Sequence, residues 1–445
     1  MTGVTRRRSL RGMLTGDDRQ IATLAIPALG ALAAEPLYVL VDTAIVGHLG
    51  VAPLAALALA GALLSAVVGL CNFLAYGSTP KVGRLYATGQ RRAAAALGTQ
   101  AMILAVVLGL TLTAVAVALA TPLLSVMGGR GRVGQLAVLY MRIAALGLPF
   151  ALLAVAAQGY LRGVSRLRLP LAILLGGNAL NAILEVLFVY GLHWGIAGSA
   201  WATVLAQSIM GTAFLPAILP GAGRPRIDWG AMRSLAGTSG EIFVRTGSLF
   251  AAFLIAGAIL ARIGTASLAA HQIAFELWSF LALVLDALAI AAQVLVSHQL
   301  GIGDGRRARE LATRTLIWSV VVGLVLAAVM LALEHQLPLA FTSNPRVLGR
   351  VAAIWPIFAL MQPVNAAVFA LDGILIGAGD TRFLMWAMVP CATLVFIPLA
   401  LLSLPAGWGI IGVWCAILAF ILARLIVCGV RFGGERWVRE GAGDR

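Results

Sequence analysis

Residues 21–46 read IATLAIPALGALAAEPLYVLVDTAIV, a run of 26 residues in which Glu35 and Asp42 are the only charged side chains. A helix needs about 20 apolar residues to cross a bilayer, so this run predicts a membrane-spanning helix. It is too long for a cleaved signal peptide, and Asp17 and Asp18 separate it from the basic residues at the N-terminus.

The rest of the 445-residue chain has the same character. Apolar residues (AVILMFWYC) make up 61% of it and charged residues 11%, against about 45–50% and about 25% in soluble domains. This composition excludes a soluble enzyme, a disordered chain and a coiled coil. Twelve runs are long enough to span a membrane, and we place them at 21–46, 52–78, 94–120, 134–160, 169–191, 195–219, 239–261, 266–296, 311–334, 347–373, 383–403 and 409–430.

The net charge of +15 would indicate a nucleic-acid partner in a soluble protein, but here the positions of the charges decide. With twelve spans and both ends on one side, 24 of the 32 Lys and Arg residues fall on that side and five on the other. Basic residues concentrate in cytoplasmic loops. We therefore expect a multi-pass membrane protein with both termini in the cytoplasm, and no nucleic-acid partner.

Signatures of enzymes and metal sites are missing from the sequence. It has no Walker motif for ATP, no His-Glu-x-x-His and no Gly-x-Ser-x-Gly. Cys71, Cys391, Cys415 and Cys428 lie in apolar runs without Cys-x-x-Cys spacing, which predicts buried free thiols. We expect no enzymatic activity, no ATP drive and no cofactor.

The chain repeats itself at a shift of 214 residues. Trp194-Gly195-Ile196-x-Gly198 matches Trp408-Gly409-Ile410-x-Gly412, and the glycines at 159 and 163 match those at 373 and 377. Six spans in each half give both halves the same orientation, so we predict an all-α membrane protein of two parallel six-helix repeats with a substrate site between them. The predicted regions are a cytoplasmic segment 1–20, an N-lobe 21–219, a cytoplasmic loop 220–238, a C-lobe 239–430 and a cytoplasmic tail 431–445.

Charged residues inside the first span are candidates for function, since each costs roughly 2.5–3.5 kcal/mol to insert. Glu35 and Asp42 are seven residues apart and share a helix face, and Pro27 and Pro36 allow that helix to bend. A bending helix with acids on one face suits a moving, ion-sensing element. The alternative is that the prolines are static kinks and the acids meet Arg142 or water.

The fifth span carries a polar stripe of Asn178, Asn181 and Glu185. Their spacing of three and four residues puts all three on one face, where they could line a hydrated cavity or a cation site. Hydrogen bonding between helices is the structural alternative. The shift of 214 replaces Asp42 and Glu185 by alanine and leucine in the second half, so we place the coupling chemistry in the first half.

Other intramembrane polar residues carry less specific expectations. Glu241 and Arg245 are four residues apart and predict a structural ion pair. We expect Asp372 to be a solvated cap near the cytoplasm and Arg424 to extend toward the interface. Asp286 and His271 are candidates for the substrate cavity, and the role of Glu276 is left open.

Several motifs together resemble one known family. They are Asp42-Thr-Ala-Ile-Val-Gly-His-Leu-Gly50, Asn181-x-x-x-Glu185, Trp194-Gly-Ile-x-Gly-Ser-Ala-Trp-Ala-Thr203, His271-Gln-Ile-Ala274 and Leu371-Asp-Gly with Gly377-x-Gly-Asp-Thr-Arg382. This set resembles the multidrug and toxic compound extrusion (MATE) family, in the branch of DNA-damage-inducible protein F. The resemblance covers about residues 20–433.

The resemblance implies a V-shaped carrier of two lobes that exports organic, often cationic, compounds in exchange for H⁺ or Na⁺. It implies that Asp42 is the coupling carboxylate and that Asn181, Glu185 and Thr203 complete a cation site. Glu185 departs from the family's usual Asp by one methylene, which favours H⁺ over Na⁺. Pro27 matches the proline whose bending is proposed to close the cavity.

We therefore predict a secondary active multidrug antiporter that works by alternating access, most simply as a monomer, on small organic substrates. The alternatives are a flippase for lipid-linked precursors or an organic-acid exporter of the same superfamily. A flippase would need a basic cavity, but the charges inside the spans are mainly acidic, and Arg142 and Arg245 are too few to make the cavity basic. A carrier of the major facilitator fold lacks support, because the basic glycine motif of that fold is not matched by the sequence at Gly83-Arg84. An intramembrane enzyme is the remote alternative.

Overall fold

The computed structural model describes residues 16–223 and 227–443, and all regular structure in these ranges is helical. The first half contains α1 (Gly16–Gly47), α2 (Val51–Leu70), α3 (Phe73–Ala87), α4 (Arg91–Val126), α5 (Gly131–Ala144), α6 (Leu148–Gly163), α7 (Arg168–Val186), α8 (Ile196–Ala213) and α9 (Leu215–Ala222). The second half contains α10 (Trp229–Ile263), α11 (Thr265–Gly301), α12 (Gly305–Ala332), α13 (Gln336–Leu339), α14 (Pro345–Leu360), α15 (Gln362–Gly377), α16 (Thr381–Pro390), α17 (Ile397–Leu402), α18 (Gly409–Gly433) and α19 (Arg436–Gly443).

Twelve membrane spans are confirmed, with one of them broken. Eleven helical segments of the described chain are long and apolar enough to cross a membrane, and α14 with α15 makes a twelfth through a bend of 48°. The prolines of the first span leave α1 a single helix of 32 residues. Seven residues of the charge count, Arg6, Arg7, Arg8, Arg11, Arg224, Arg226 and Arg445, lie outside the described ranges.

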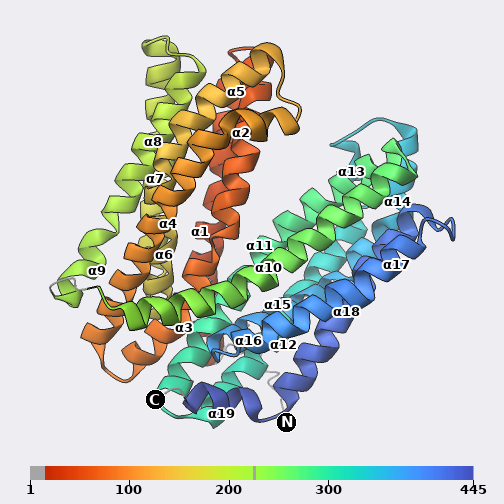
Figure 1. The fold of residues 1–445 in the computed structure, drawn as a ribbon. Helices are drawn as coiled ribbons and strands as arrows, with labels where there is room; N and C mark the ends of the chain where they lie inside the picture. Colours follow the sequence, from red (N-terminus) through yellow and green to blue (C-terminus); the bar gives the residue numbers. More distant parts are fainter. Residues whose placement is uncertain (1–15, 224–226, 444–445) are drawn as a thin grey trace, which may run out of the picture.

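The helices form two lobes arranged as a V (Figure 1). The lobe of α1–α9 is the N-lobe and the lobe of α10–α18 is the C-lobe. The lobes diverge toward the ends that carry α5 and α14, and they meet near α3 and the start of α12. At the closed end a buried cluster joins Leu24 and Ala28 of α1 to Leu288 and Ala291 of α11.

The sequence repeat is visible in how the helices touch. A Cβ atom on Gly159 of α6 would lie 2.8 Å from the backbone of Ala75, and one on Gly373 of α15 would lie 2.2 Å from the carbonyl oxygen of Ala289. Residues 75 and 289 are themselves 214 apart. The same holds where Gly163 meets Thr79 and Gly377 meets Gln293. Each lobe therefore uses one small-residue stripe to bring two helix backbones together.

We expect Gly373→Ala to destabilise the C-lobe. The added methyl group cannot move away from a backbone carbonyl, and overpacking of this kind costs roughly 1–3 kcal/mol. The apparent Tm of the purified protein in detergent should fall by several degrees. Gly257→Ala on α10, where no atom lies within 4 Å of the added carbon, is the control and should leave the Tm in place or raise it. Equal Tm values for the two variants would contradict the close approach.

Candidate functional site

The predicted coupling residues meet where α1, α7 and α8 come together. Asp42 on α1 is 6% exposed, and its Oδ1 accepts a hydrogen bond of 2.9 Å from Ser199 Oγ on α8. One turn earlier on α1, the hydroxyl of Tyr38 lies 3.0 Å from Thr203 Oγ1 on the same face of α8. Two successive turns of α1 and α8 are thus joined by polar side chains.

The fifth span completes this cluster. Glu185 on α7 is fully buried and lies close enough to Asp42 for the two carboxyl groups to interact electrostatically. Neither of its carboxylate oxygens has a hydrogen-bond partner among the described residues. Asn181, one turn before it on the same helix, is 2% exposed. A carboxyl group that is buried without partners must be neutralised, by a proton or by a cation, because a bare buried charge is very costly.

No arginine or lysine of the described ranges forms an ion pair with Asp42 or Glu185, and Arg142 is exposed elsewhere on the surface. The described residues also hold no group of three or more His, Cys, Asp or Glu side chains that could bind a metal ion. The oxygens present are those of two carboxylates, an amide and hydroxyls. Ser199 and Tyr38 were not predicted, although each lies four residues from a predicted partner, Thr203 and Asp42.

The candidates for the substrate cavity do not form one site. Glu35 is exposed on α1. Asn178 of α7 donates a hydrogen bond of 2.8 Å to the Ala34 carbonyl of α1, which is the hydrogen bonding between helices given as the alternative for this stripe. His271 is 4% exposed in the aromatic core of the C-lobe, with its ring stacked on Phe275. Asp286 lies on α11 at the junction of the lobes, where it accepts a hydrogen bond of 2.5 Å from the Tyr76 hydroxyl.

Three expectations about charged residues inside the spans are wrong. Arg245 does not pair with Glu241 but with Asp372, whose carboxylate also binds Arg424 at 2.6 Å. Asp372 and Arg424 are each 5% exposed, so Asp372 is not a solvated cap and Arg424 does not reach the interface. Glu241 accepts a hydrogen bond from Thr381 instead.

Two further corrections concern burial. Cys415 is exposed on the outer face of α18, where lipid can cover a thiol as well as protein can. The span predicted at 134–160 would leave Arg162 in the following loop, but this residue belongs to α6 and is 8% exposed.

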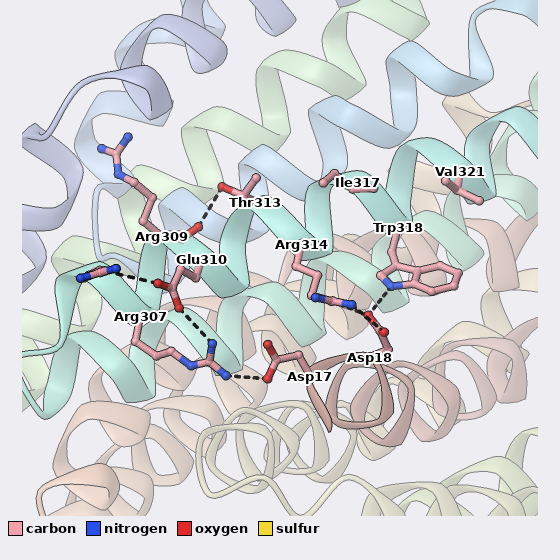
Figure 2. A pocket seen from close by; sticks show the side chains of 11 residues that line it. Asp17, Asp18, Arg307, Arg309, Glu310, Thr313, Arg314, Ile317, Trp318 and Val321 are labelled. Carbon is pink, nitrogen blue, oxygen red and sulfur yellow. Dashed lines mark hydrogen bonds and ion pairs between the residues drawn. The ribbon is translucent and has the colours of Figure 1, made fainter. Parts of the chain in front are cut away.

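A group of five residues, here called the α1–α12 clasp, closes the lobes at their basic end (Figure 2). Asp18 binds Arg314 through two hydrogen bonds, of 2.5 and 2.8 Å, and accepts a third of 2.8 Å from the Trp318 indole. Asp17 pairs with Arg307 at 2.5 Å. The clasp lines an open pocket of about 920 Å³. Because α1 belongs to the N-lobe and α12 to the C-lobe, these contacts hold the closed end of the V.

Two further contacts close the same end. Lys81 of α3 donates hydrogen bonds of 2.9 and 2.7 Å to the carbonyl and hydroxyl oxygens of Ser234 on α10. The ring of His298 on α11 lies 2.6 Å from the Gly163 carbonyl at the end of α6.

We expect Asp18→Asn to favour separation of the lobes at this end. The substitution keeps the shape of the side chain but removes the charge that binds Arg314, so the population of separated lobes should rise several-fold. Distances between spin labels at the exposed positions Gln90 and Ile302, in a cysteine-free background, would measure it. Glu435→Gln, which breaks an exposed pair with Arg439, is the control. Unchanged distances in the Asp18 variant would show that the clasp does not hold the lobes.

Comparison with known proteins agrees with this architecture. The MatE family model matches residues 27–187 and 244–402. Protein DETOXIFICATION 44, chloroplastic, from Arabidopsis thaliana is 31% identical over 430 residues, covering 93% of this chain and 82% of that protein. DNA damage-inducible protein F of Escherichia coli K12 is 29% identical, covering 92% and 91% of the two chains. A Vibrio cholerae MATE transporter solved in a bent form has the same fold, with a TM-score of 0.86 at 19% identity over 95% of this chain and 97% of that one. The chain belongs to the MatE family, the family of the multidrug and toxic compound extrusion (MATE) transporters.

Proposed function

We propose that this protein exports small organic compounds in exchange for H⁺, and that Asp42 and Glu185 take up the coupling proton. The observation that carries the proposal is the environment of Glu185, which is fully buried, unpartnered and next to a second carboxylate. Two such groups cannot both stay ionised at low cost. A proton entering from the open side of the V neutralises the pair and joins α1, α7 and α8 more tightly.

The number of free oxygen atoms in the cluster bears on which ion is coupled. A proton needs one lone pair, whereas a metal cation needs several oxygens around it at once. The longer side chain of Glu185 lies where the family has Asp, and Ser199 already occupies one oxygen of Asp42. These features support H⁺ over Na⁺, with Asn181 and Thr203 as positioning residues and α1, with its two prolines, as the element that moves.

The orientation follows from the arginines. The closed end of the V carries the basic loops, and such loops face the cytoplasm. We place both termini in the cytoplasm of a bacterial cell, in the plasma membrane, so that this conformation opens outward. Both lobes come from one chain and the sequence has no Walker motif, which supports action as a monomer without ATP.

Uptake into proteoliposomes tests the proposal. The purified protein is reconstituted, and a pH gradient and a Na⁺ gradient are imposed separately while dye uptake is followed with ethidium, a cation, and fluorescein, an anion. We expect the pH gradient to drive uptake of at least one dye and the Na⁺ gradient to drive none. Glu185→Gln should reduce the pH-driven uptake. Uptake driven by Na⁺ alone, or no gradient-driven uptake of either dye, would overturn the proposal.

A further inference from the structure

Arg162 is a buried cation without a partner. It is 8% exposed at the end of α6, and its guanidinium forms no hydrogen bond or ion pair with any residue of the described ranges. The guanidinium lies over the face of the Tyr76 ring, 5.7 Å from the ring centroid. A guanidinium has five N–H donors, and Arg162 uses none of them on another described residue. The mechanism proposed above gives this residue no role.

The surroundings of Arg162 hold more positive than negative charge. The Tyr76 hydroxyl holds Asp286, which interacts electrostatically with Arg162 and with Arg245 but forms an ion pair with neither. Arg245 shares Asp372 with Arg424, and its Nε has no hydrogen-bond partner. Three arginines thus face two carboxylates. The next carboxylate along α10, that of Glu241, is held by Thr381.

The two arginines with unused donors come from opposite lobes. Arg162 lies on α6 of the N-lobe and Arg245 on α10 of the C-lobe, and Asp286 of α11 acts on both. The hydrogen bond from Tyr76 to Asp286 also crosses from lobe to lobe. Separation of the lobes at this end would break that bond and expose both guanidinium groups.

We propose that Arg162 and Arg245 bind an oxyanion, such as a carboxylate, of the exported compound, and that Asp286 balances their charge after the compound has left. This inference rests on the proposed export function and names its substrate class. Guanidinium groups bind carboxylates through two parallel hydrogen bonds, and two of them on opposite walls can hold one anionic group. Asp286 competes with the substrate, so closing the lobes around Tyr76 and Asp286 expels the anion toward the open side.

Binding of fluorescein, a dianion, to the detergent-solubilised full chain tests this assignment. We expect Arg162→Gln to weaken binding by about tenfold or more. Arg162→Lys should weaken it by less, because lysine keeps the charge but loses the two parallel N–H donors of the guanidinium. Asp286→Asn should strengthen binding several-fold, because it removes the competing carboxylate. Arg166→Gln, an exposed neighbour four residues away, is the matched control and should bind as the wild type does.

The outcomes separate this inference from the proposed function. Opposite effects of the Arg162 and Asp286 variants support the anion site, since damage to the fold would weaken both. If the wild type takes up ethidium under a pH gradient but does not bind fluorescein, or if the Arg162 and Arg166 variants behave alike, the inference is wrong and the export function stands. If neither dye moves under any gradient while fluorescein still binds as described, the export function fails and the anion site stands.

Discussion

Replacing Asp42 with asparagine should reduce pH-driven uptake to the level of protein-free vesicles. Asparagine keeps an oxygen that can accept the Ser199 hydrogen bond, so α1 and α8 stay joined, but it cannot take up a proton. Coupling therefore ends while the fold remains. Uptake into proteoliposomes under a fixed pH gradient is the measurement, with the apparent Tm as a check on folding.

The control for this experiment is a second carboxylate within a membrane helix. Glu276→Gln on α11 changes an exposed acid whose partner is Gln272, and uptake should stay at the wild-type level. Because an asparagine at 42 resembles the neutral acid, any residual exchange of dye should no longer depend on pH. Gradient-driven uptake that survives in the Asp42 variant would exclude Asp42 as the coupling group.

The largest loss of stability is expected from Asp372→Ala. This change leaves Arg245 and Arg424 buried without their common counter-ion, and breaking a buried pair from one side costs roughly 3–5 kcal/mol. The yield of folded protein and its apparent Tm should both fall sharply. Adding Arg424→Met should recover part of the loss, because it removes one of the two unpaired cations.

A surface ion pair provides the comparison. Glu310→Ala removes a partner of Arg306 and Arg307 at exposed positions, where such pairs contribute about 0–1 kcal/mol. Its Tm should stay close to that of the wild type. If the Asp372 variant is as stable as the Glu310 variant, the buried ion pairs do not support the C-lobe.

The spans could be predicted from the sequence because apolar length alone defines them. The break at Met361 could not, since the apolar pattern runs through it. Pro363 lies in the first turn of α15, where its missing N–H costs nothing. The convergence of Asp42, Glu185 and Thr203 was predicted through the family resemblance. Composition by itself only marked the acids as unusual.

Residue spacing along a helix could not predict ion pairs between residues that lie far apart in the sequence. Four-residue spacing favoured pairing Arg245 with Glu241, but tertiary packing placed Asp372 against it, 127 residues away. The predicted span likewise ended at residue 160 and left Arg162 in the following loop, where a basic residue usually faces water. Only the approach of α3 and α11 shows that it is buried beside Tyr76.

The two halves that repeat every 214 residues differ in their carboxylates, and this difference limits the substrate gradient that the proposed transporter can maintain. Both lobes share a backbone arrangement, yet the positions that match Asp42 and Glu185 in the C-lobe are Ala256 and Leu399. Under the proposed coupling the carboxylate pair that takes up protons therefore lies in the N-lobe alone, and each cycle draws on that one pair. Each proton contributes about 1.4 kcal/mol per pH unit. One site thus sets the steepest substrate gradient that the cell can maintain through this protein. Replacing Ala256 and Leu399 by carboxylates would raise that limit.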